Sequence, residues 1–127
     1  MATQEQNGSI STSLEDATKF IAAFSDIPSY QRLFYADRQN VIFPRSRTTT
    51  PPNYPKGLYS VDAVVKVGFI VAENGSVEAA RVLHASDSRF NEAAIESVKQ
   101  WTFYSGYRNG KVDKFAMIID VSFGGRR

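Results

Sequence analysis

Residues 65–77 read VKVGFIVAENGSV. Between Val65 and Val71 every second residue is apolar, which is the period of a β-strand that buries one face. Asn74-Gly75 follows this run, and that dipeptide favours the positive φ angles of a tight hairpin turn. A second extended run starts at Val77. The pattern therefore predicts a β-hairpin with strands at residues 64–71 and 77–85.

A helix and a last strand are predicted after the hairpin. Five apolar side chains of residues 88–101 share one helical stripe: Phe90, Ala94, Ile95, Val98 and Trp101. This spacing predicts a helix at residues 88–100. Asn109-Gly110 is a second turn signal, and strict alternation from Phe115 to Phe123 predicts a strand at residues 114–123. A helix with one apolar stripe packs on strands with one apolar face, so we expect two layers.

The connection rules predict the order of the strands. The helix carries the chain back along the hairpin, and a right-handed crossover then places the last strand beside the first. The sequence therefore predicts an α+β fold of order β-β-α-β, with one main helix on a three-stranded antiparallel sheet of strand order 2-1-3. The last strand is expected at an edge. Eight side chains are predicted to be the most buried: Val67, Phe69, Val98, Trp101, Phe103, Met117, Ile119 and Val121.

The chain is divided into three predicted segments. Residues 1–12 are a polar tail, residues 13–44 a helical extension and residues 45–127 the main domain, which begins with an extended linker at residues 45–55. Within the extension, an extra N-terminal helix is expected to end at Pro28, followed by a helical turn at residues 30–35. Two interpretations of the extension remain open: it packs on the exposed side of the domain, or it is an arm for partner binding or oligomerisation.

Composition excludes several functions. The net charge of +2 with scattered basic residues does not favour nucleic acid, and the chain has no Cys for disulfides or thiolate metal sites. No apolar run has the roughly 18–20 residues that a membrane span needs. His84 is the only histidine, and no motif supplies it with a nucleophile or a metal. We therefore expect no catalytic residue, no metal site and no cofactor.

Several motifs follow one another in the second half of the chain. They are Tyr54-Pro55, the alternating strand with its Asn-Gly turn, a helix that closes on Trp101-Thr102-Phe103, and the last alternating strand. In this order they resemble the C-terminal domain of the TonB family, the periplasmic end of energy transducers that serve outer-membrane receptors. The resemblance implies a periplasmic domain that binds the receptor's TonB box peptide and couples transport to inner-membrane energy.

A TonB-type transducer carries an N-terminal membrane anchor and a Pro-rich spacer, and neither is expected in this chain. The sequence is then either a piece of a longer protein, whose anchor would reach an inner-membrane proton-channel complex, or a family member without the anchor.

The last strand is the predicted route to binding. An edge strand presents unpaired N–H and C=O groups, to which an extended peptide can add as a further strand. The resemblance implies that the TonB box binds there and near the Tyr-Pro motif. The candidate partner-binding residues are Tyr54, Pro55, Phe115, Ala116, Met117, Ile118, Ile119, Asp120 and Val121. Two alternatives remain: a TolA-like envelope-tethering module, or a non-catalytic structural domain whose edge strand forms a homodimer.

Overall fold

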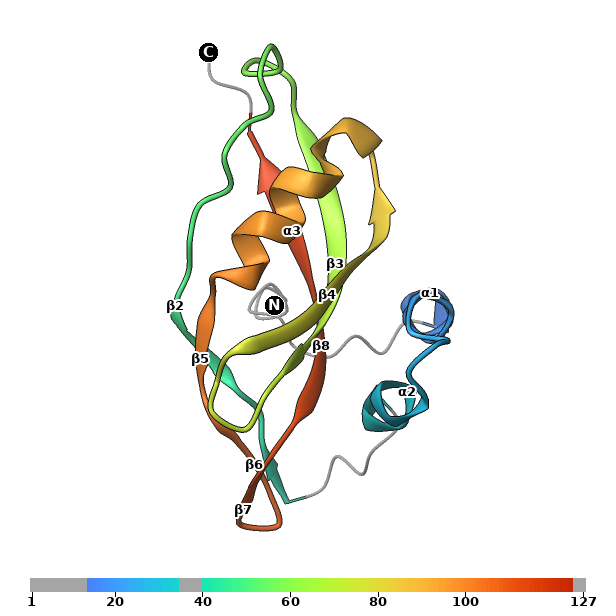
Figure 1. The fold of residues 1–127 in the computed structure, drawn as a ribbon, viewed down its shortest axis with the longest axis vertical. Coiled ribbons are helices and arrows are strands. Elements are labelled where there is room, and N and C mark those ends of the chain that lie inside the picture. The colour runs from blue at the N-terminus through green and yellow to red at the C-terminus, as the bar shows by residue number, and fades with distance from the viewer. Residues whose placement is uncertain (1–13, 35–39, 125–127) are drawn as a thin grey trace.

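A computed structural model describes residues 14–34 and 40–124 of the chain. Its main sheet consists of three nine-residue antiparallel strands, β3 (Ala63–Val71), β4 (Val77–Ala85) and β8 (Phe115–Phe123). They lie in the order β4-β3-β8, with β8 at an edge (Figure 1). The α+β class is confirmed, and these strands lie within about one residue of the predicted bounds. The β-β-α-β description is incomplete, because five shorter strands accompany them.

One face of the main sheet is covered by the predicted helix. A 3₁₀ turn, η2 (Ser88–Phe90), leads into α3 (Asn91–Lys99), and the Asp87 carboxylate caps the turn by accepting from the Arg89 N–H at 3.0 Å. Seven of the eight side chains predicted as core are buried there. The exception is Trp101, which is only partly buried because it lies just past the end of α3.

The other face of the sheet is covered by two helices that precede it in the chain, α1 (Leu14–Ala23) and α2 (Pro28–Phe34) (Figure 1). Phe20 and Phe24 are fully buried there, in a cluster with three sheet residues: Ile70, Ala116 and Ile118. The predicted two-layer packing is therefore wrong, because apolar residues on this second face of the sheet also need cover. Pro28 begins α2 rather than ending the first helix, in keeping with the first-turn preference of proline.

Gly68 explains how closely α1 approaches the sheet. A Cβ added to Gly68 would lie 3.0 Å from Cδ2 of Phe20 and 3.2 Å from Cδ2 of Leu83. The glycine in the middle of β3 therefore leaves room for the Phe20 ring. This packing agrees with the first interpretation of the N-terminal extension. The predicted tail at residues 1–12, and Tyr35 of the predicted helical turn, lie outside the described residues.

The residues interpreted as a linker contain a strand. β2 (Arg45–Thr48) pairs antiparallel with β5 (Thr102–Tyr104). Three further short strands form a second small sheet in the order β1-β6-β7: β1 (Val41–Ile42), β6 (Gly106–Arg108) and β7 (Lys111–Asp113). Asn109 and Gly110 join β6 to β7 with two positive φ angles, whereas at the Asn74-Gly75 turn only Gly75 has one.

Candidate functional site

The free edge of β8 is the first part of the candidate site. All nine residues of β8 are in register with β3 on one side. Among residues 14–34 and 40–124, no strand pairs with the other side. Six of the seven candidate side chains on β8 are at most 5% exposed: Phe115, Ala116, Met117, Ile118, Ile119 and Val121. The strand therefore offers a partner its backbone groups rather than these side chains.

Asp120 is the one exposed candidate on β8. Its carboxylate lies 3.5 Å from Nζ of Lys66 on β3, and Asp16 of α1 lies 3.3 Å from the same nitrogen. Partial burial of Lys66 opposes its charged form, but the carboxylates of Asp120 and Asp16 outweigh it and raise the pKa of the ammonium group. Asp120 is therefore held by a cation on its own sheet.

Tyr54 lies at the C-terminal end of β8. Its ring meets that of Phe123 edge-on with a centroid distance of 5.6 Å, and that of Phe90 at 6.3 Å. Its hydroxyl donates to the carbonyl oxygen of Gly124, the residue that follows the strand. The structure thus brings Tyr54 and the end of β8 together.

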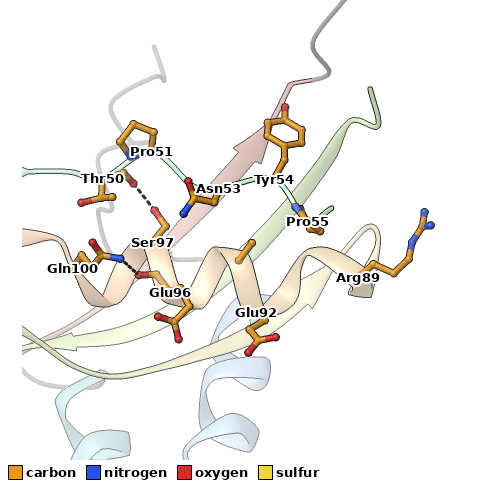
Figure 2. A pocket seen from close by; sticks show the side chains of 11 residues that line it. Thr50, Pro51, Asn53, Tyr54, Pro55, Arg89, Glu92, Glu96, Ser97 and Gln100 are labelled. Carbon is orange, nitrogen blue, oxygen red and sulfur yellow. Dashed lines mark hydrogen bonds between the residues drawn. The ribbon is translucent and has the colours of Figure 1, made fainter. Parts of the chain in front are cut away.

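Pro55 is not placed on the β8 edge. Its carbonyl oxygen accepts from the Leu58 N–H at 3.0 Å, which forms a turn after Tyr54. Its ring lines a groove on the α3 side of the molecule (Figure 2). The predicted residues are therefore divided: those on β8 form the strand edge, Pro55 lines this groove, and Tyr54 borders both.

The groove lies between residues 50–55 and helix α3 (Figure 2). Two side chains fix the extended segment: the hydroxyl of Ser97 donates to the carbonyl oxygen of Thr50, and Nε1 of Trp101 donates to the same oxygen at 3.2 Å. The cavity has a volume of about 280 Å³. The sequence analysis did not identify Ser97. A signal was present, because Ser97 lies three positions after Ala94 on the apolar stripe of α3, and a polar residue buried there needs a hydrogen-bond partner.

Charged groups surround the groove. Glu92 and Glu96 project from α3, and Glu96 lies 3.9 Å from Nζ of Lys99. Arg89 lies at the end of the groove in a two-bond pair with Asp87, which lowers the pKa of that carboxyl group. Within the described ranges no three His, Cys, Asp or Glu residues gather to hold a metal, and His84 lies exposed on β4 opposite Lys66.

Comparison with known proteins identifies the family of this chain. The model of the Gram-negative bacterial TonB protein C-terminal family matches residues 50–124, which is more than half of the chain. The match includes the three long strands, α3 and Tyr54-Pro55, and it begins after α1 and α2. No curated protein matches. In the described part of the chain, no helix is long and apolar enough to cross a membrane.

A solved structure is also similar. It is the solution NMR structure of the Pseudomonas aeruginosa TonB CTD, with 18% sequence identity and a TM-score of 0.48. The alignment covers 72% of this chain and 90% of that one.

Proposed function

Since the chain belongs to the family of Gram-negative bacterial TonB C-terminal domains, a non-catalytic family of periplasmic energy-transducer domains, we propose that it binds an outer-membrane receptor by strand addition. The ligand is an extended peptide of the receptor, which pairs with the free edge of β8. Binding would couple transport through the receptor to energy from the inner membrane.

The observation that carries the proposal is the nine-residue edge of β8. The strand pairs on one side only in the described structure, and Asp120 is the single exposed side chain between Phe115 and Val121. A peptide there gains its affinity mainly from backbone hydrogen bonds. Tyr54 lies beside the end of β8, which supports a contact between its side chain and the peptide where the peptide leaves the strand.

The sheet also suits the transmission of force. β3 is the central strand, paired with β4 on one side and with β8 along its whole length on the other. A pull on a peptide along β8 therefore acts in shear on many hydrogen bonds at once. The buried side chains of β8 tie the strand to helices on both faces of the sheet.

An NMR titration with peptides from the periplasmic end of outer-membrane receptors tests the proposal. We expect backbone amide shifts at residues 115–121 and near Tyr54, with a dissociation constant in the micromolar range that is typical of small, transient interfaces. In a second series, proline is moved along the peptide one position at a time. An added strand points alternate N–H groups at β8, so proline should abolish binding at every second position and be tolerated between.

Asp120→Ala is the matched control. It removes the only exposed candidate side chain but no backbone donor, so peptide affinity should change less than about threefold. Shifts confined to α1 and α2 would contradict the proposal. A homodimer that already occupies the β8 edge would support the structural alternative. If the effect of proline on affinity did not alternate along the peptide, the peptide would not bind as an added strand.

A further inference from the structure

The short strands form a basic end of the molecule that the proposed receptor site does not use. Residues 41–48 and 102–114, which contain all five short strands, carry five basic residues and one acidic residue, a net charge of +4. The whole chain has a net charge of only +2, so the remaining residues together carry a net charge of −2. Figure 1 shows β6 and β7 at one end of the long axis of the molecule, with β2 and β5 leading into them.

Three of the five cations have no carboxylate partner in the described structure. Arg108 pairs with Asp113 at 3.0 Å, and Lys114 pairs with Glu78 at 3.2 Å. Arg45, Arg47 and Lys111 form no ion pair within residues 14–34 and 40–124, and all three are exposed. The positive charge of this end is thus available to an external anion.

An apolar row lies on the same small sheet. Ile42 of β1 is directly opposite Tyr107 of β6, and Tyr107 is directly opposite Val112 of β7. Residues opposite each other in antiparallel strands share one face of the sheet. All three are exposed, and Ile42 reaches 63%. Three apolar side chains therefore stand side by side across three strands without cover from the described residues.

Arginine and tyrosine lie together on the neighbouring pair of strands. The guanidinium carbon of Arg45 lies 5.1 Å from the ring centroid of Tyr104, and that of Arg47 lies 6.0 Å from it. Tyr104 is half exposed. Such stacking holds two guanidinium groups ready for phosphate oxygens while the ring keeps an apolar side toward the solvent.

We propose that this end, defined by Ile42, Arg45, Arg47, Tyr104, Tyr107, Lys111 and Val112, binds the surface of an anionic phospholipid bilayer. Tyrosine, arginine and an aliphatic side chain are the residues that settle at the headgroup boundary, where the ring and methyl groups enter the acyl region and the cations meet phosphates. The end tapers to the β6–β7 hairpin in Figure 1, so it can approach a planar surface without obstruction from the helices. Each unpaired cation contributes about 1 kcal/mol near such a surface, which is about fivefold in affinity.

Vesicle flotation of the full chain tests the proposal, with vesicles of equal phosphatidylcholine and phosphatidylglycerol compared with pure phosphatidylcholine. We expect binding to the anionic vesicles only, weakened by added salt. Arg45→Gln with Arg47→Gln should lower the partition coefficient about 25-fold, from two fivefold steps. Ile42→Ser, which keeps the charge, should lower it by about threefold to tenfold through the lost apolar contact.

The matched control removes two exposed cations elsewhere, with Arg32→Gln and Lys56→Gln. It should change the partition coefficient less than threefold, and circular dichroism should show all variants folded, because each replaced side chain is exposed. An equal loss in the control would overturn the proposal, since net charge alone would then explain binding. Binding of wild type to a poly-glutamate peptide but not to anionic vesicles would overturn it in favour of an acidic protein partner.

Discussion

The two faces of the main sheet are covered by helices that differ in origin and in chemistry. The face under α3 belongs to the residues that match the TonB family, and fourteen buried apolar residues form its cluster. The face under α1 and α2 uses helices that precede the family match, and only five residues form its buried cluster. One sheet therefore carries a large core built within the family match and a smaller core that helices outside the match complete.

Polar contacts compensate for the smaller cluster. Nη1 of Arg81 on β4 donates to the carbonyl oxygen of Ala23 at the end of α1 at 2.8 Å, and its guanidinium pairs with Asp26. The hydroxyl of Tyr30 on α2 donates to Glu78. Apolar burial therefore dominates under α3, whereas the docking of α1 and α2 on the sheet also depends on charge.

The largest expected loss of stability comes from a substitution in the cluster under α3. Phe69 is fully buried in the middle of β3, with its ring centroid 5.6 Å from that of Phe103. Phe69→Ala should lower the free energy of unfolding by about 3–5 kcal/mol, because it leaves a cavity that the sheet cannot close. Urea denaturation followed by circular dichroism measures this. A loss below about 1 kcal/mol would mean that this cluster is not the main core.

Phe20→Ala makes the matched change on the other face. Phe20 is equally buried, but α1 and α2 can separate from the sheet while its strands stay paired. We expect a loss of about 2–3 kcal/mol in global stability, smaller than for Phe69, together with faster amide exchange in α1. If Phe20→Ala lowered the free energy of unfolding as much as Phe69→Ala and accelerated amide exchange in β3 to the same extent, the two faces would unfold as one cooperative unit. That result would contradict this account.

The smallest expected change in stability is that of Glu78, and it depends on pH. The hydrogen bond from Tyr30, and then that from Lys114 at 3.2 Å, lower the pKa of the Glu78 carboxyl group below its usual 4.5. A lowered carboxyl pKa stabilises the fold above about pH 4.5, and that contribution is lost as the pH falls further. Glu78→Gln should therefore remove less than about 1 kcal/mol at neutral pH.

Urea midpoints measured at neutral pH and in acid, for wild type and Glu78→Gln, separate this contribution from general acid effects. The difference between the two proteins should shrink in acid. Tyr30→Phe should reproduce part of it, because that change removes only the donor hydroxyl. A difference that stays constant with pH would show that the carboxylate does not stabilise the docked helices.

The sequence predicts the long elements because their signals are local. Alternation from Ala63 to Val71 and from Phe115 to Phe123, with turn residues between, needs no knowledge of distant partners. The pairing of Arg45 with Tyr104 joins residues far apart in the chain, so residues 45–48 carry no local sign of a strand. Cover on the second face was one of the two open interpretations of the N-terminal extension, and Ile70, Ala116 and Ile118 make this face apolar.

The candidate site was predictable to the same extent. Strict alternation places β8 and the connection rules place it at an edge, so the backbone route to binding follows from the sequence. The position of Tyr54 beside Phe123 depends on tertiary packing, and only the family resemblance pointed to it. The hydrogen bond from Ser97 to Thr50 joins the two walls of the groove, and its partner could not be identified from either segment alone.

Amide hydrogen exchange along β8, measured residue by residue with and without saturating receptor peptide, tests strand addition most directly. In the free protein, alternate amides between Phe115 and Phe123 should exchange slowly because they donate to β3, and those between them should exchange quickly. With peptide bound, the quickly exchanging set should become protected while the rest of the sheet changes little. The account would be contradicted if every β8 amide were already protected in the free protein, or if saturating peptide left the quickly exchanging set unprotected.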